Sequence, residues 1–380
     1  MINPEFGYYL CNGVTFEKKI EALIYSKTTN KPVEWYFQDH IYSKYPWHIE
    51  PEQSLDELYD LRTKDLREKY DYLILCFSAG ADSYNILESF IRQGIHLDEI
   101  VTMHTAYSVK VHANLDVRDT SNSNLPAEHI LNAIPRLKYA SEKLPKTKIT
   151  VIDDTDTLFD KLKNYENEDW IFKRNDHLGV FAPNRFNFFE VKDLRVKFDK
   201  YQKVGIIYGR DKPKIKFRGN EVYTTFTDVG LNTMKVTTHN TDYDNITSEY
   251  FYWNSSCLPM MAKQAHVVKR WLENNPSLLP YWINPSVSKN RGMQENLLRE
   301  VIYTTWNKNW FQVSKKTSQW NNGEDWFAED PSFSKDHMLW KRGFDYATTL
   351  LKDYIIFTDN KPDGFIPFMK SYHIGTLKYV

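Results

Sequence analysis

Short apolar runs alternate with helix-like patterns through the middle of the chain. Tyr72 to Phe77 is a continuous apolar run, which is typical of a strand buried on both faces. The same region predicts further strands at residues 97–104, 148–154 and 203–209, and amphipathic helices at residues 83–93, 127–143 and 155–164. Strands that alternate with helices favour a parallel sheet with right-handed crossovers. We therefore expect an α/β fold with helices on both faces of a parallel sheet.

Different patterns flank this alternating region. Residues 8–37 predict a small strand–helix–strand unit, and residues 54–70 predict a helix with Ser54 as its N-cap and Glu57 three residues later. Residues 220–238 alternate about a glycine and predict a hairpin. Helical patterns return at residues 260–272, 293–306 and 335–354. The expected parts are a small N-terminal α+β unit (1–53), the alternating domain with the hairpin insertion (54–275) and a helical, aromatic-rich C-terminal region (276–380).

The composition excludes several classes of protein. The 49 basic and 50 acidic side chains leave a net charge of -1, which disfavours a large nucleic acid as partner. Cys11, Cys76 and Cys257 are odd in number and far apart, so neither a disulfide framework nor a zinc site is indicated. No stretch approaches the about 18 apolar residues of a membrane span, and no basic segment with an apolar core opens the chain. We expect a cytoplasmic protein without a membrane partner.

A polar loop, FSAGADS (77–83), joins the first strand of the alternating region to its first helix. Backbone N–H groups converge at such a loop and the helix N-terminus is partially positive, so the loop suits a phosphate. Ser78 and Ser83 add hydroxyl donors, and Gly80 lets the backbone approach closely. Asp82 would repel a bare phosphate, so it is expected to hold magnesium through a water or to cap the helix. The P-loop pattern, GxxxxGK, is absent. The alternative is a strand–helix turn without a ligand.

FSAGADS resembles the SGGxDS pyrophosphate loop of the PP-loop ATP pyrophosphatases, the adenine nucleotide α-hydrolase-like family. The match covers six residues, and the alternating pattern supports it over about residues 60–215. The resemblance implies a Rossmann-like sheet, ATP and Mg²⁺ as ligands, and cleavage of ATP between its α and β phosphates. Ala79 stands where glycine is commonest, although some sulfate-assimilation members carry a larger residue there. The implied ATP- and pyrophosphate-binding residues are Ser78, Ala79, Gly80, Ala81, Asp82 and Ser83.

Within the family, residues 61–83 (LRTKDLREKYDYLILCFSAGADS) resemble the start of the asparagine synthetase C-terminal domain. The glutaminase half of that enzyme has no counterpart, since position 2 is Ile2 and not its nucleophilic cysteine. An amine or ammonia would therefore come free or from another protein. The layout is also similar to stand-alone asparagine-synthase-like proteins of bacteriophages, which implies the host cytoplasm. Sulfur transfer is less favoured, because Cys76 lies inside the predicted strand and no cysteine has a paired partner.

A second loop is expected to meet FSAGADS at the carboxyl edge of the sheet, where ligands bind in open α/β folds. YGRDKPK (208–214) follows the strand at 203–209. Arg210 and Lys212 would neutralise charge on the leaving pyrophosphate, and Asp211 would hold magnesium or a substrate amine. These are the candidate catalytic residues. The alternative is a charged surface turn closed by a proline.

Two further groups are candidate ATP-binding residues. The strand at 97–104 ends in Thr102, Met103 and His104, and the family resemblance implies that this end frames adenine. Lys263 lies on a predicted helix whose basic face also carries His266 and Arg270. That face would lean over the triphosphate or, alternatively, would be an ordinary solvated face.

Three functions remain open at this point. The first is an AMP-forming, ATP-dependent ligase similar to asparagine synthetase, in which a carboxylate or amide oxygen of a small-molecule acceptor attacks ATP and an amine displaces AMP. The second is a nucleotide-binding module or scaffold that has lost this chemistry within a larger assembly. The third is an enzyme that modifies a nucleotide or base. The tryptophan- and tyrosine-rich C-terminal region fits a core, a partner interface or a homo-oligomer contact.

Overall fold

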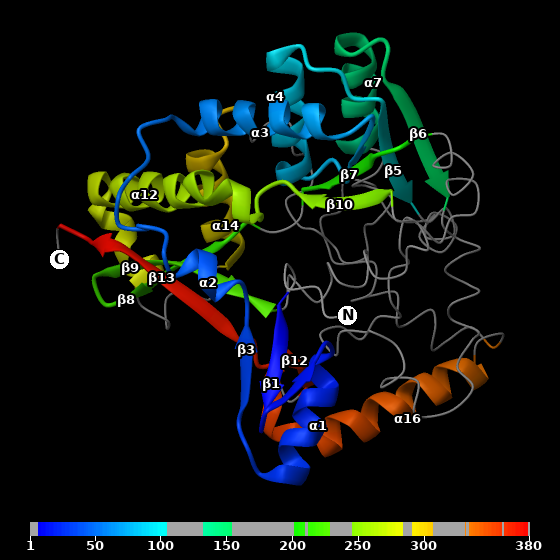
Figure 1. The fold of residues 1–380 in the computed structure, drawn as a ribbon, viewed down its shortest axis with the longest axis vertical. Helices are drawn as coiled ribbons and strands as arrows, with labels where there is room; N and C mark the ends of the chain where they lie inside the picture. The colour runs from blue at the N-terminus through cyan, green and yellow to red at the C-terminus, as the bar shows by residue number, and fades with distance from the viewer. Residues whose placement is uncertain are drawn as a thin grey trace.

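The chain adopts an α/β fold with a five-strand parallel sheet flanked by helices and with small antiparallel sheets beside it (Figure 1). The computed structural model describes residues 7–104, 132–153, 201–209, 212–228, 245–283, 291–306, 331, 334–358 and 361–378. Within these ranges, no helix combines the length and apolar character that crossing a membrane requires. The α/β class expected from the alternating pattern is confirmed.

The parallel sheet has the strand order β10-β7-β4-β5-β6, and every neighbouring pair is parallel. Its strands are β4 (Tyr72–Cys76), β5 (Glu99–His104), β6 (Lys148–Asp153), β7 (Val204–Tyr208) and β10 (Ile246–Tyr250). The first four match predicted strands, whereas β10 (ITSEY) escaped prediction because it has no apolar run. From β4 the chain moves outward to β5 and β6 and then returns to the other side of β4 with β7. The strand order therefore reverses between β4 and β7.

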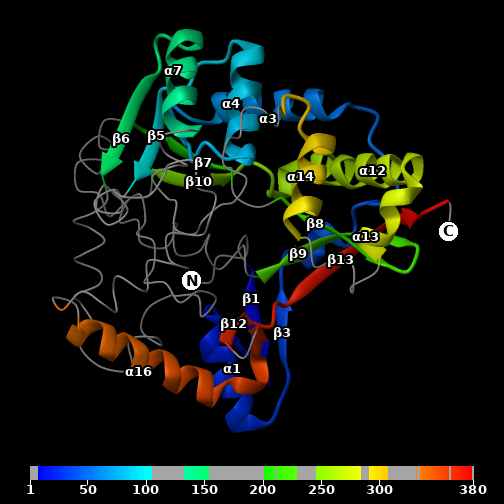
Figure 2. The same cartoon turned by 180° about the vertical axis from the view of Figure 1, so that it is seen from behind.

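Three helices lie side by side over one face of this sheet: α3 (Leu55–Lys69), α4 (Ala81–Gln93) and α7 (Ile134–Lys143) (Figures 1 and 2). The predicted capping box is present at the start of α3, where Ser54 and Glu57 bond reciprocally. Helix α4 ends as predicted at Gly94, whose φ of 61° is the left-handed conformation that glycine adopts readily. The predicted helix at 155–164 lies outside the described residues.

The N-terminal unit is α+β, as predicted. It contains β1 (Tyr8–Cys11), β2 (Val14–Phe16), α1 (Lys19–Thr29), β3 (Val33–Tyr36) and α2 (Asp39–Tyr42). Residues predicted as one strand form the β1–β2 hairpin, because Asn12 and Gly13 both have positive φ and make a tight turn. Strand β1 pairs on its other edge with β3.

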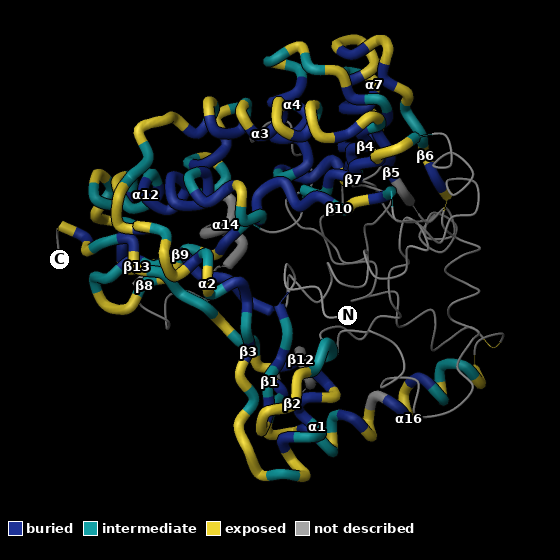
Figure 3. Tube along the Cα trace, viewed as in Figure 1, coloured by how far each residue is buried: buried dark blue, intermediate teal, exposed yellow. Residues whose placement is uncertain are grey.

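A second antiparallel sheet, of order β13-β9-β8, joins distant parts of the chain. It consists of β8 (Lys214–Arg218), β9 (Glu221–Thr227) and β13 (Met369–Thr376). Strand β9 covers the first half of the predicted hairpin and pairs with β8 and β13 on its two edges, and residues 229–244 lie outside the described ranges. Its inner face packs on α12 (Leu258–Asn274), and Figure 3 shows buried chain running from the parallel sheet through α12.

The C-terminal region is only partly helical. Helices follow at α13 (Leu279–Ile283), α14 (Arg291–Ile302) and α16 (Ser334–Leu350), with 3-10 turns at Ser255–Cys257, Pro276–Leu278 and Lys352–Tyr354. The chain then forms β11 (Ile355–Thr358), β12 (Lys361–Phe365) and β13. Sequence reasoning missed these strands because their polar and apolar residues alternate too irregularly, and because β13 finds its partner, β9, far back along the chain.

Candidate functional site

The loop Ser78–Gly80 leaves the carboxyl end of β4 and opens α4, at the point where the strand order reverses. Open α/β sheets bind ligands in the crevice at such a switch point. Ala79 has a φ of 56°, in the left-handed region, where a side chain with a Cβ costs about 1–2 kcal/mol. Gly80 is extended, with φ -75° and ψ 169°, and forms the N-cap of α4 without any side-chain cap. The backbone conformation that favours glycine is therefore found at Ala79 and not at Gly80.

Two hydroxyl groups line the loop. Ser78 is exposed, Ser83 is buried, and their Oγ atoms lie 3.3 Å apart. The Gly80 N–H donates to Ser78 Oγ at 3.4 Å, and Ser83 Oγ donates to the Gly80 carbonyl at 3.2 Å. These contacts are long for hydrogen bonds, so an anion at the start of α4 can recruit both hydroxyls without breaking a strong bond.

Arg136 of α7 supports the loop from the protein interior. Its buried guanidinium donates to the carbonyl of Ala79 and stacks 4.9 Å from the ring centre of Tyr84. This bond fixes Ala79, so a residue of α7 stabilises the conformation of the loop. No pattern around Arg136 pointed to the role.

The carboxyl end of β7 touches the first turn of α4. A Cβ on Gly209 would lie 2.8 Å from the backbone nitrogen of Ser83 and 2.9 Å from its Cα, so only glycine allows this approach. The contact brings the second predicted loop to the first, as expected from the shared sheet edge. Lys212 lies there, and Arg210 and Asp211 are outside the described residues. In the sequence, this close approach was indicated by Gly209, which directly follows the strand β7.

Asp82, in the first turn of α4, is the centre of the polar contacts. Its Oδ1 lies 3.0 Å from the Lys212 ammonium and also accepts a hydrogen bond from the Tyr303 hydroxyl. Its backbone carbonyl accepts one from Tyr252 at 2.9 Å. Burial, and next the Asp82 carboxylate, raise the pKa of Tyr303 well above its ordinary value, so the tyrosine remains a donor. The N-cap of α4 is Gly80, and the carboxylate of Asp82, within the first turn, contacts Lys212 and Tyr303.

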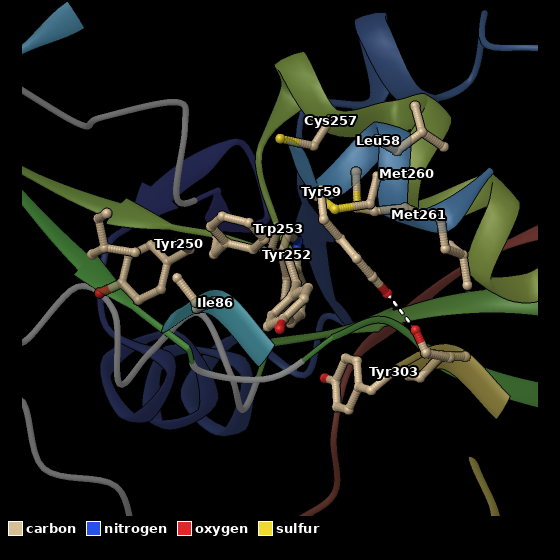
Figure 4. Packing of buried hydrophobic residues seen from close by; sticks show 14 of the residues in the cluster. Leu58, Tyr59, Ile86, Tyr250, Tyr252, Trp253, Cys257, Met260, Met261 and Tyr303 are labelled. Carbon is tan, nitrogen blue, oxygen red and sulfur yellow. Dashed lines mark hydrogen bonds between the residues drawn. The ribbon is translucent and has the colours of Figure 1, made fainter. Parts of the chain in front are cut away.

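Three tyrosines from different elements gather beneath this turn. Tyr59, Tyr252 and Tyr303 have ring centres 5.7–6.4 Å apart, and Figure 4 shows them side by side. The Tyr59 hydroxyl donates to the carbonyl of Ile302 at 2.8 Å, which anchors the end of α14. Asn85 of α4 donates to the Tyr252 hydroxyl at 2.9 Å. Nothing in the sequence indicated that these residues meet.

A magnesium ion fits this site only together with phosphates. The described residues contain no group of three histidine, cysteine or acidic side chains placed to hold a metal. In nucleotide sites, however, Mg²⁺ needs only one or two carboxylates in addition to the phosphate oxygens. Asp82 already faces a cation, the Lys212 ammonium, and its side chain is 16% exposed. The carboxylate is therefore positioned to accept a metal brought in by a nucleotide.

The other predicted ATP-binding residues divide into two groups. Thr102 is buried in β5, opposite Val151 of β6, near the carboxyl edge of the sheet. Met103 and His104 complete β5, and their side chains lie outside the described part. Because Cys76, the last residue of β4, pairs with Val101, the carboxyl end of β5 extends past the end of β4.

Lys263 is engaged away from the loop. Its ammonium lies 2.7 Å from Glu50 and donates to the Pro51 carbonyl at 2.8 Å. Arg270 binds the same carboxylate, and His266 lies 3.0 Å from the carbonyl of Trp47. Lys263 and His266 on this face of α12 thus hold the segment before α3, whereas the Arg270 side chain is 52% exposed.

Cys76 and Cys257 lack the character of nucleophiles. Burial raises the pKa of the Cys76 thiol to about 12, and it also raises the pKa of Cys257. Both thiols are therefore protonated at neutral pH, and the thiolate is the reactive form. This agrees with the low expectation for sulfur transfer.

Comparisons with protein-family models and with curated protein sequences find no match for this chain. The family resemblance therefore rests on the residues of the loop and on their setting between β4 and α4.

Proposed function

We propose that the chain binds ATP at the loop Ser78–Ser83 and cleaves it to AMP and pyrophosphate, as an AMP-forming ligase. The observation that carries the proposal is the loop geometry. A left-handed residue and an uncapped N-terminal glycine open a helix at the switch point of a parallel sheet, with serine hydroxyls and a lysine beside them. Each feature favours a phosphate group.

The residues have separable roles in this proposal. The first-turn N–H groups of α4 and the hydroxyls of Ser78 and Ser83 receive the β and γ phosphates. Lys212 leaves Asp82 to neutralise the charge that grows on the leaving pyrophosphate. Asp82 would hold the Mg²⁺ that accompanies ATP, and the metal would supply further neutralisation of phosphate charge.

The reaction class follows from the family resemblance of FSAGADS. A carboxylate or amide oxygen of the acceptor forms a bond to the α-phosphorus, and the bond to the β-phosphate oxygen breaks. Pyrophosphate carries away that electron pair. An amine then attacks the activated carbon, loses a proton and releases AMP. The protein contributes positioning and electrostatic stabilisation, which dominate catalysis of phosphoryl and nucleotidyl transfer.

The proposal is tested by identifying the products that form from ATP. The protein, Mg-ATP and a panel of carboxylate and amide acceptors with ammonia are incubated, and nucleotides and phosphates are quantified by ion-exchange chromatography. We expect AMP and pyrophosphate in equal amounts, and none from a Lys212→Met variant. ADP and phosphate as the only products would contradict the proposal. Tight ATP binding without turnover across the panel would instead support the nucleotide-binding module.

A further inference from the structure

Tyr303 donates a hydrogen bond to the carboxylate of Asp82 from a distant part of the chain. The two residues are 221 positions apart, and Tyr303 comes directly after α14. Its side chain is 1% exposed, and its hydroxyl donates to Asp82 Oδ1. The end of α14 is itself anchored, since Tyr59 bonds to the carbonyl of Ile302. A rigid element far along the chain therefore fixes the acidic side chain of the loop.

Tyr252 provides an internal comparison for this contact. It is as deeply buried as Tyr303, lies against it in the same aromatic cluster, and also donates to Asp82. Its acceptor, however, is the backbone carbonyl. Tyr252 thus holds the main chain of the first turn, whereas Tyr303 holds the carboxylate. Loss of the Tyr252 hydroxyl removes this bond and the one that it accepts from Asn85, whereas loss of the Tyr303 hydroxyl removes the bond to the carboxylate. Only the second loss affects the direction of the carboxylate.

Lys212 shares the carboxylate oxygen with Tyr303. Its ammonium lies 3.0 Å from Asp82 Oδ1 and 5.4 Å from the ring centre of Tyr303. Lys212 is more exposed than Tyr303 and carries a flexible stem, so it can leave when phosphates arrive. Tyr303 is confined by its packing. The carboxylate therefore keeps one direction whichever cation it faces.

We propose that Tyr303 is a positioning residue of the nucleotide site, which holds the Asp82 carboxylate in the direction needed to bind the magnesium ion of Mg-ATP. This inference rests on the proposed function, because it requires that a nucleotide binds at the loop. It goes beyond the loop motif by making the C-terminal region part of the site. A fixed carboxylate gains metal affinity because its rotamer freedom is already lost before the metal binds.

The experiment separates a positioning role from a structural one. The dissociation constant of ATP is measured by calorimetry in EDTA and in saturating Mg²⁺, for the wild type, Tyr303→Phe and the matched control Tyr252→Phe. Both variants keep the ring and its packing and lose one hydroxyl. We expect the melting temperature to fall at least as far in Tyr252→Phe as in Tyr303→Phe, because the Tyr252 hydroxyl also accepts a hydrogen bond from Asn85. We expect Mg²⁺ to strengthen ATP binding in the wild type and in Tyr252→Phe, and this gain to shrink about tenfold in Tyr303→Phe.

Two further results decide the matter. In an Asp82→Asn background, Tyr303→Phe should leave the magnesium gain unchanged, because the carboxylate that it positions is gone. If the magnesium gain of Tyr303→Phe equals that of the wild type, Tyr303 has a structural role alone and the inference is wrong. If the wild type binds no ATP under either condition, the proposed function itself fails, which is a different result from an unchanged Tyr303→Phe.

Discussion

Asp82 and Glu249 are two carboxylates in the same domain, each held by a lysine and a tyrosine hydroxyl, yet their surroundings differ. Glu249 of β10 is 1% exposed, and both of its oxygens are bonded: Oε1 by Lys69 and Tyr70, and Oε2 by Arg62 at 2.7 Å and by Asn254. Asp82 is 16% exposed and lies in the first turn of α4, at the carboxyl edge of the sheet.

The difference separates a carboxylate that is enclosed by its partners from one that is partly exposed. Burial alone would raise the pKa of Glu249, but the charge of Arg62 and the hydrogen bonds from Lys69 and Tyr70 outweigh it and lower that pKa. Glu249 therefore stays ionised and joins α3 to β10. Asp82 has a partner that can leave, Lys212, and lies where phosphates would arrive. A lysine and a tyrosine thus accompany a fully enclosed carboxylate at Glu249 and a partly exposed one at Asp82.

The largest expected loss of stability follows from a change at the buried ion pair of Arg62 and Glu249. Arg62→Met leaves a buried carboxylate without its guanidinium, and removal of one member of a buried ion pair costs about 3–5 kcal/mol. Urea denaturation should show this loss in the free energy of unfolding. The matched change at the partly exposed pair of Lys212 and Asp82, Lys212→Met, should cost less than about 1 kcal/mol, because Asp82 is accessible to water. Equal losses of unfolding free energy in Arg62→Met and Lys212→Met would contradict the difference between the two carboxylates.

Gly209 tests the backbone contact that joins the two loops. Gly209→Ala adds a Cβ that would overlap the backbone of Ser83, so α4 and β7 must separate. Overpacking of this kind costs about 1–3 kcal/mol. We expect a lower melting temperature together with weaker ATP binding. Gly219→Ala, at a hairpin turn, is the control: its Cβ meets nothing within 4 Å, but the left-handed φ of 57° should cost about 1–2 kcal/mol of stability while ATP binding stays unchanged.

The pH dependence of stability should report Glu249. Its pKa is lower in the folded protein than its ordinary value of 4.5, so its stabilising contribution is complete above that value and is lost as the pH falls through the folded pKa. Glu249→Gln should therefore flatten the loss of stability below about pH 4.5. Chemical denaturation of the wild type and the variant at several acidic pH values measures the two slopes. Parallel slopes would mean that Glu249 is not held ionised by its partners.

The smallest expected effect has an unusual sign. Ala79→Gly should stabilise the protein by about 0.5–1 kcal/mol, because Ala79 is left-handed and glycine adopts that conformation without strain. At most positions the reverse holds, since glycine gains entropy in the unfolded state. The control is Ala140→Gly within α7, which should destabilise. A lower melting temperature for Ala79→Gly would show that the loop does not strain Ala79.

Much of the fold was predictable from local patterns, and much of the site was not. The apolar run at β4, the capping box at Ser54 and the stop at Gly94 are encoded within a few residues, and each was predicted correctly. The meeting of FSAGADS with YGRDKPK also followed from sequence, because parallel strands share a carboxyl edge. Local reasoning did not foresee the contact of Lys263 with Glu50, which lies in a segment without regular pattern.

The contacts that shape the loop come from distant residues. Arg136 reaches Ala79 across 57 positions, and Tyr252 reaches Asp82 across 170. A tyrosine or arginine that meets its partner only after folding leaves no periodic signal in the sequence. The need for a left-handed residue at Ala79 was likewise hidden, because alanine does not mark that conformation as glycine does.

The central claim, that Ser78–Ser83 binds the phosphates of ATP, is tested most directly by thermal unfolding of the wild type and Gly80→Val with and without millimolar Mg-ATP. Gly80 has an extended backbone that valine can adopt, but the residue is buried, so the variant should melt below the wild type while its side chain blocks the phosphates, and the decisive readout is the shift that Mg-ATP produces in each protein. We predict that Mg-ATP raises the melting temperature of the wild type by about 2–5 °C and leaves Gly80→Val unchanged. No shift in the wild type, or an equal shift in both proteins, would contradict the claim.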